Sequence, residues 1–232
     1  MYEKRLICLA NSRKPPSGRC IAGKEYNGQA FGEWIRPVSA RATHEVSEEE
    51  RRYDGGGKAK LLDIVSIPLL NHSPELHQTE NHTLDDGYYW TKQGIATWQQ
   101  ILDAEDDFDP NFWAAAQSTR HGRNDKVPEA QLQNLGSSLK LILVKSLTVI
   151  VQTEAGYDGA PGRRRVRARF RYEGTNYQLS LTDPALEDKY LQEGNGEYQI
   201  SDAALCISVV EKWNGYAFRV VASVIVEDDC EG

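Results

Sequence analysis

The sequence predicts a mostly β protein built from two small barrels with short helical insertions. Strand-like runs dominate the chain and fall into two halves, each with about five short strands and a helical insertion. The length of 232 residues allows two domains of about 100 residues, or one larger β domain. Because no close internal repeat is visible, the division into two barrels depends on the strand count alone.

In the first half, four runs carry β-branched or aromatic residues and are bounded by Gly, Pro, Ser or Asp, as is typical of strands. These runs are residues 5–10, 19–25, 33–38 and 61–69. Three helical stretches are also expected, the first of them polar and facing solvent. Asp109 before Pro110 is a typical N-cap with proline in the first turn of the third stretch. The helical stretches are residues 45–52, 95–102 and 109–117.

The polar segment 118–138 contains Gly122, Pro128 and Gly136, and it predicts an irregular end to the first half. We therefore expect a first domain over residues 1–135 and a second over residues 136–232. The second half begins with a long strand and contains one helix, at residues 184–191, for which Asp183 before Pro184 is the expected N-cap. Its predicted strands are residues 139–153, 163–172, 177–181, 204–210 and 217–226.

Composition excludes several classes of protein. A net charge of −7 excludes a uniformly basic nucleic-acid-binding protein, although a local basic groove is compatible with it. The four cysteines form no CxxC pair, so neither a structural zinc site nor a disulfide framework is expected. No apolar run approaches the roughly 18 residues that span a bilayer, and the early run LICLAN is too short for a secretory signal. We expect a cytoplasmic protein without a membrane partner.

A row of arginines in the run 163–172 is the sharpest local pattern. If this run is a strand, alternate residues share a face and lie roughly 6.7 Å apart, similar in scale to phosphates along an extended single strand. Guanidinium groups match phosphate geometry, so the row indicates an anion or nucleic-acid contact. The alternative is a face neutralised by some of the 34 acidic residues. The members of the row are Arg163, Arg165, Arg167, Arg169 and Arg171.

A second pattern pairs an aromatic ring with a cation. On a strand, Trp34 and Arg36 point the same way, and together they suggest a stacking platform for a base. The alternative is a core tryptophan beside an arginine that ends a strand at Pro37, because tryptophan is mostly buried whatever its function.

The remaining motifs do not predict catalysis. His77, Glu80 and His82 suggest a metal, but their spacing places the two histidines on opposite faces of a strand, so no metal site is expected. The sequence contains no P-loop, dinucleotide fingerprint or nucleophile elbow, and we expect no catalytic residue and no cofactor.

Seven pieces of the sequence, in matching order over nearly the whole chain, resemble the bacterial dual OB-containing domain family. The resemblance implies two OB-type barrels and a role in recognition of nucleic acid or nucleotides, in mobile-element or phage conflict. It carries no catalytic residues. The pieces are KRLICLANSRKPPSGRCIAG, EWIRPVS, LLDIVSIPL, HQTENH, RNDKV, RVRARFRYEGTNYQLSLTDP and LCISVVEKWNGYAFRVVASVIV.

In an OB barrel, the loop between the first two strands borders the ligand surface. The stretch NSRKPPSGRC is that loop, and it places Arg13, Lys14 and Arg19 at the rim of such a surface. We therefore expect a non-catalytic module that recognises single-stranded DNA or RNA, or a nucleotide-like ligand. Two alternatives remain open: an adaptor that recruits an effector protein, and an enzyme that acts on nucleotides.

Overall fold

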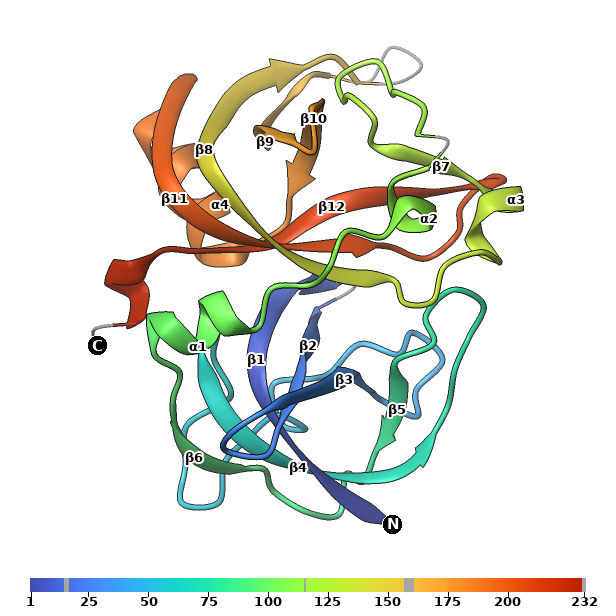
Figure 1. Cartoon of the computed structure of the whole chain (residues 1–232), viewed down its shortest axis with the longest axis vertical. Helices are drawn as coiled ribbons and strands as arrows, with labels where there is room; N and C mark the ends of the chain where they lie inside the picture. The colour runs from blue at the N-terminus through green and yellow to red at the C-terminus, as the bar shows by residue number, and fades with distance from the viewer. Residues whose placement is uncertain (15–16, 115, 157–160, 231–232) are drawn as a thin grey trace.

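The computed structural model describes residues 1–14, 17–114, 116–156 and 161–230. It contains two six-stranded sheets, stacked along the long axis of the molecule with short helices beside their junction (Figure 1). The amino-terminal strands form the lower unit of that view, and the chain then crosses to the upper unit. None of the helices described is long and apolar enough to cross a membrane.

The first sheet closes on itself. Its strands pair in the order β1-β2-β3-β5-β4, and β1 also pairs with β4, so five strands form a ring. Every pairing in this ring is antiparallel except that of β3 with β5. β6 adds to the outside of β4. The strands are β1 (Tyr2–Lys14), β2 (Gly18–Tyr26), β3 (Phe31–Val38), β4 (Asp63–His72), β5 (Asn81–Leu84) and β6 (Thr91–Ile95).

The second sheet has the same topology. Its ring runs β8-β9-β10-β12-β11 and closes between β11 and β8, and again only the pairing of the third and fifth strands, β10 and β12, is parallel. This arrangement is the five-stranded Greek-key barrel of the OB fold. Each sheet has a sixth strand beyond the five expected. The strands are β7 (Lys126–Pro128), β8 (Leu139–Glu154), β9 (Arg163–Tyr172), β10 (Thr175–Leu181), β11 (Gly196–Val209) and β12 (Tyr216–Ile225).

Two helices begin at the caps predicted from the sequence. The carboxylate of Asp109 accepts a hydrogen bond from the backbone of Asn111, and that of Asp183 accepts from Ala185 and Leu186. Such caps each contribute about 1 kcal/mol. The helices are α1 (Trp98–Asp103), α2 (Pro110–Trp113), α3 (Glu129–Leu132), α4 (Pro184–Glu193) and the 3-10 turn η1 (Glu227–Cys230).

The helix predicted over residues 45–52 is wrong, because this segment forms turns. Ser47 and Glu50 do exchange the hydrogen bonds of a helix cap. Residues on either side of them pair elsewhere, Val46 with Arg19 and Arg52 with Lys58, and these contacts prevent a helix from continuing.

Three apolar clusters stabilise the molecule. One fills the first barrel around Ile35, Val65 and Trp90, and another fills the second around Val149, Phe170 and Leu205. The third joins the barrels, since residues of β1, β3 and β4 pack there against residues of β8, β11 and β12. The two barrels therefore share a continuous buried interface.

The segment between the barrels packs against the second one. β7 pairs with β12, and Phe112, Trp113 and Leu132 belong to the second core. The buried guanidinium of Arg219 on β12 donates to the carbonyls of Phe112, Ala114 and Asn124, which holds α2 and the following loop in place. The sequence predicted a domain boundary after residue 135, whereas the structure packs this segment against the second barrel. The polar composition of residues 118–138 does not show which core its few apolar residues enter.

Candidate nucleic-acid interface

The arginine row lies on the outer surface of the second barrel. In β9, Val166, Ala168 and Phe170 are buried in the barrel core, whereas the arginines between them point outward. β9 and β10 are the second and third strands of this ring, and their outer surface is the one on which OB folds bind oligonucleotides. On β10 the outward neighbours are Asn176, Gln178 and Ser180, all polar. The predicted alternation of β9 is confirmed.

Two of the arginines are neutralised by carboxylates. Arg167 is only 7% exposed, and its Nε and Nη2 donate to both oxygens of Glu154 on β8. Burial tends to raise the pKa of Glu154, but the hydrogen bond and charge of Arg167 keep it below its ordinary value. Arg169 forms an exposed pair with Glu197, at 2.6 Å between Nη2 and Oε2. At these two positions the salt-bridged alternative holds.

The other three arginines are exposed and available. Among the described residues, no carboxylate lies within 4.0 Å of the guanidinium of Arg163, Arg165 or Arg171. Exposed cations without a fixed partner keep their donors free for an incoming anion.

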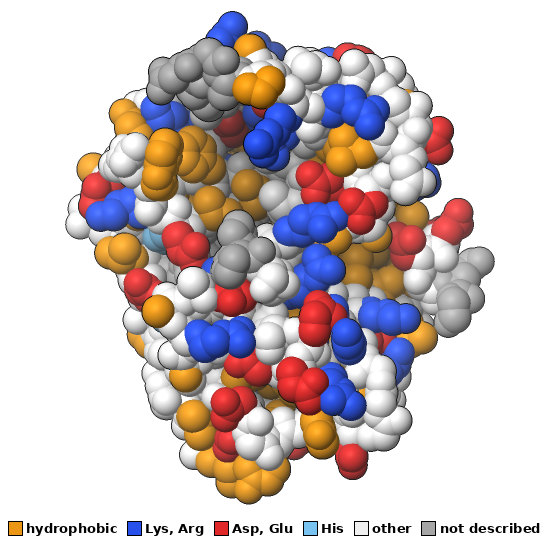
Figure 2. Space-filling model, turned by 180° about the vertical axis from the view of Figure 1, so that it is seen from behind, with side chains coloured by type: hydrophobic (Ala, Val, Ile, Leu, Met, Phe, Trp, Pro, Cys, Tyr) orange, Lys and Arg blue, Asp and Glu red, His pale blue; other side chains and the backbone are white. Residues whose placement is uncertain are grey.

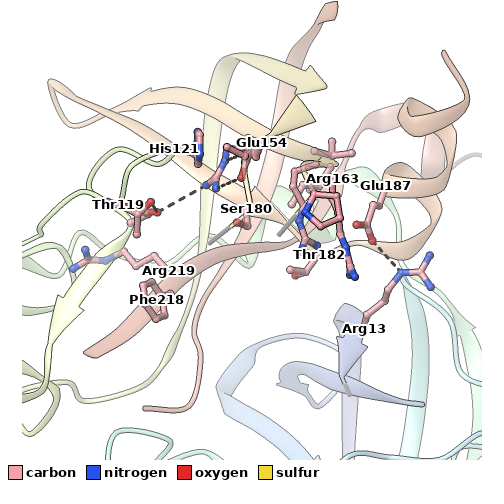
Figure 3. Close-up of a pocket in the computed structure, with 18 residues that line it drawn as sticks. Arg13, Thr119, His121, Glu154, Arg163, Ser180, Thr182, Glu187, Phe218 and Arg219 are labelled. Carbon is pink, nitrogen blue, oxygen red and sulfur yellow. Dashed lines mark hydrogen bonds and ion pairs between the residues drawn. The ribbon is translucent and has the colours of Figure 1, made fainter. Parts of the chain in front are cut away.

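A cavity of about 630 Å³ lies beside this row and brings distant segments together (Figure 3). Arg163, Arg165 and Arg167 line it from β9, and Ser180 and Thr182 line it from β10 and the residue after it. Further lining residues come from the loop before β7, from β12, from α4 and from β1; they include Thr119, His121, Phe218, Glu187 and Arg13.

Arg13 brings the first barrel to this cavity. Its backbone N–H donates to the carbonyl of Thr182 at 3.2 Å. Its guanidinium pairs with Glu187 at 3.0 Å and with Asp188 at 2.5 Å, both on α4. Arg13 therefore shares a groove with the arginine row but is already held by two carboxylates.

Arg13, Lys14 and Arg19 were expected in a loop but lie in β1 and β2, because the two strands pair as far as Lys14 and Gly18. Lys14 and Arg19 lie apart from this cavity. Lys14 pairs with Glu211 at 2.5 Å, in the hairpin between β11 and β12. Arg19 lies 3.8 Å from Glu48 within the first barrel. Positive and negative side chains are accordingly interspersed over the side of the molecule turned away in Figure 1 (Figure 2).

The expected stacking platform of Trp34 and Arg36 is wrong. Trp34 is 7% exposed and Arg36 is 2% exposed. The indole Nε1 of Trp34 donates to Asp106 at 3.0 Å, and Arg36 pairs with Glu80 at 3.1 Å. The segment after α1 and the strands of the second barrel cover this face, and no local pattern in the sequence shows that cover.

The segment 77–82 fastens the two barrels together. Nε2 of His77 hydrogen bonds the carbonyls of Val209 and Val210 at 3.2 and 3.1 Å, and Thr79 donates to the carbonyl of Gly136 at 2.6 Å. Within the described ranges, no group of three or more His, Cys, Asp or Glu side chains is placed to hold a metal ion.

Sequence reasoning missed the loop that borders the groove. Thr119 and His121 line the cavity, and Thr119 donates to Asp125, which lies 3.9 Å from Arg167. Arg123 pairs with Gln178 and holds this loop along β10. Its composition is that of an ordinary polar loop, so the sequence carries no signal for this role.

Two closed rings with the same strand order, one of them carrying a cationic outer face, define a protein of the OB class. A model of the dual OB-containing domain family matches residues 4–224, nearly the whole chain. The chain belongs to the dual OB-containing domain family. Searches of curated proteins and of solved structures found no match. Membership in this family suggests a binding module.

Proposed function

We propose that this protein is a non-catalytic module that binds single-stranded nucleic acid across β9 and β10 of its second barrel. The observation that carries the proposal is the set of three exposed arginines, Arg163, Arg165 and Arg171, that have no carboxylate partner among the described residues. They lie on the face that OB folds use for oligonucleotides.

The size of this face supports a short site. From Arg163 to Arg171, β9 extends about 26 Å at 3.3 Å per residue. That length suits a site of about four nucleotides, the lower end of the range for one OB fold. Polar side chains of β10 and the rings of His121 and Phe218 lie beside it for contacts to sugars and bases.

The arrangement of the barrels supports a site on the second one. The corresponding face of the first barrel is buried, as Trp34 and Arg36 show. Its two ligand-bordering ends contact the second barrel, through Arg13 at the end of β1 and through His77 in the loop between β4 and β5. We therefore assign the first barrel a supporting role.

The electrostatics favour a modest, salt-dependent affinity. The net charge of −7 opposes approach of a polyanion, so binding depends on the local arginines. Few phosphates would be neutralised, and affinity would fall with salt because each released counterion gains less entropy in a more concentrated solution.

Fluorescence anisotropy with labelled eight-nucleotide single strands of DNA and RNA, at 50 and 200 mM salt, tests this function. We expect saturable binding at the lower salt, weaker binding at the higher salt and preference for single strands over a duplex. Absence of binding to every strand at 50 mM would refute the proposal. Gel analysis of the strands after incubation with Mg²⁺ tests the non-catalytic part, since shortened products would contradict it.

An adaptor that recruits an effector protein is the second candidate. Exposed aromatic side chains favour it: Trp213 in the β11–β12 hairpin is 67% exposed, and Tyr88 and Tyr89 are 60% and 53% exposed. Large exposed aromatic residues are typical anchors of protein interfaces. A partner protein whose binding is lost in Trp213→Ala, with nucleic-acid binding absent, would establish this candidate in place of the first.

A further inference from the structure

A second cavity, of about 270 Å³, lies between the two barrels. The first barrel lines it with Ser12 and Lys14 of β1, Cys20 of β2 and Arg36 of β3. The second barrel lines it from β11, β12, the hairpin between them and the residue after β10. Polar and cationic groups, together with the carboxylate of Glu211, thus surround a space in the interface.

Arg36 is the central group of this cavity. Arg36 is 2% exposed. Its Nη2 donates hydrogen bonds to the hydroxyls of Ser138 and Ser208 and forms the ion pair with Glu80. Neither Nε nor Nη1 has a hydrogen-bond partner in the part of the chain that the structure describes. Of these two nitrogens Nε is buried, and a buried donor without an acceptor costs about 1–3 kcal/mol.

Glu80 does not supply that acceptor. Its two oxygens accept from the hydroxyls of Ser137 and Ser138 and from the backbone N–H of Ser138, besides the pair with Arg36. Both oxygens of Glu80 are thus occupied by these donors. An anionic acceptor from outside the protein would give the remaining donors of Arg36 a partner.

A second cation lies in the same cavity. Lys14 is only 14% exposed, and its ammonium group pairs with Glu211, whose side chain is 58% exposed. An exposed carboxylate can turn to solvent at little cost, since an exposed ion pair contributes about 1 kcal/mol or less. Lys14 can then donate into the cavity beside Arg36.

We propose that this inter-barrel cavity binds a phosphoryl group, held by Arg36 and Lys14. The volume is close to the lower limit of about 300 Å³ for small-molecule sites, so it suits a mononucleotide or the end of a longer ligand. Arg13 and Thr182 line both this cavity and the larger groove. A terminal phosphate of a strand lying on β9 and a free mononucleotide are therefore the two sources of the same group. The cavity itself does not depend on strand binding.

Cys20 reports occupancy, because its half-buried thiol lines the cavity. In a Cys230→Ser background, alkylation of Cys20 is followed with inorganic phosphate or AMP added at constant ionic strength. We expect alkylation to slow at least about fivefold at saturating ligand. Unchanged alkylation at millimolar concentrations of both ligands would overturn the proposal.

Two variants identify the binding groups. Lys14→Ala should raise the half-saturating concentration about tenfold, the loss of one charge-assisted hydrogen bond. Lys212→Ala is the matched control, because Lys212 forms an equivalent 2.5 Å pair with Glu129 in the same hairpin region but does not line the cavity. Equal effects of the two variants would contradict the assignment.

Short strands distinguish the sources. Protection of Cys20 by a strand with a terminal phosphate, but not by the same strand without one, would identify the strand end as the ligand. Protection by AMP with no difference between the strands would identify a free nucleotide. Because the phosphate and AMP measurements need no strand, failure of strand binding leaves this test decisive.

Discussion

The free arginines of β9 provide the sharpest prediction. In Arg163→Ala plus Arg165→Ala, two of the three exposed arginines without a carboxylate partner among the described residues are removed, while the buried pair of Arg167 with Glu154 stays intact. Three phosphate contacts on a single strand give a slope of about −2 for the logarithm of the binding constant against that of salt, and one contact gives about −0.7. From 50 to 200 mM salt, the affinity should fall about 20-fold for the unmodified protein and about 3-fold for the double variant.

Anisotropy titrations at four or more salt concentrations measure these slopes. Arg164→Ala is the matched control, since Arg164 lies on the same strand, is exposed and points to the opposite side. It should leave the slope unchanged. An unchanged slope in the double variant, or the same reduction in Arg164→Ala, would refute the assignment of the β9 face. Charge reversal at Arg167 is unsuitable, because it would bury a carboxylate against Glu154 and Asp125.

Three further predictions concern stability and reactivity. Burial, together with His72 and Lys4, lowers the pKa of His82 from 6.5 to about 4. Its contribution to stability is therefore present above pH 6.5 and is lost as pH falls toward 4. Urea unfolding measured against pH should show a smaller loss of stability in His82→Gln than in the unmodified protein. Arg219→Met should lower the free energy of unfolding by about 3 kcal/mol or more, because it leaves buried carbonyls without donors. An unchanged urea midpoint would contradict the role of Arg219 in holding α2 and the following loop. Alkylation of the native protein, detected by mass spectrometry, should modify Cys20 and Cys230 and leave Cys8 and Cys206 unmodified. The reason is that burial raises the pKa of Cys8 to about 12 and that of Cys206 well above its ordinary value.

Local patterns predicted much of the fold. The caps at Asp109 and Asp183 and the alternation of β9 follow from rules that act within a few residues. The short strands β5, β6 and β7 were not predicted, because three to five residues carry too little pattern and depend on pairing with distant partners. The helix expected over residues 45–52 failed for the same reason, since long-range bridges outweighed its local preference.

The candidate site was predicted less completely than the fold. Arg13 and three members of the arginine row line one groove, which the sequence patterns alone left undecided. Which arginines are free depends on Glu154 and Glu197, whose positions follow from the pairing of β8, β9 and β11. The loop carrying Thr119 and His121 became part of the site only through its contacts with β10 and β12.

Local sequence patterns were enough to place most of the longer strands and to show which side chains share a face, because a strand's period of two is a property of neighbouring residues. The tertiary structure alone decided which faces are accessible. Trp34 and Arg36 carry the pattern of a binding platform, yet the second barrel and residues near 106 cover them. Burial and ion pairing are settled by partners from other strands and segments, 13 positions away for Arg167 and Glu154 and 102 for Arg36 and Ser138, and only folding brings these together.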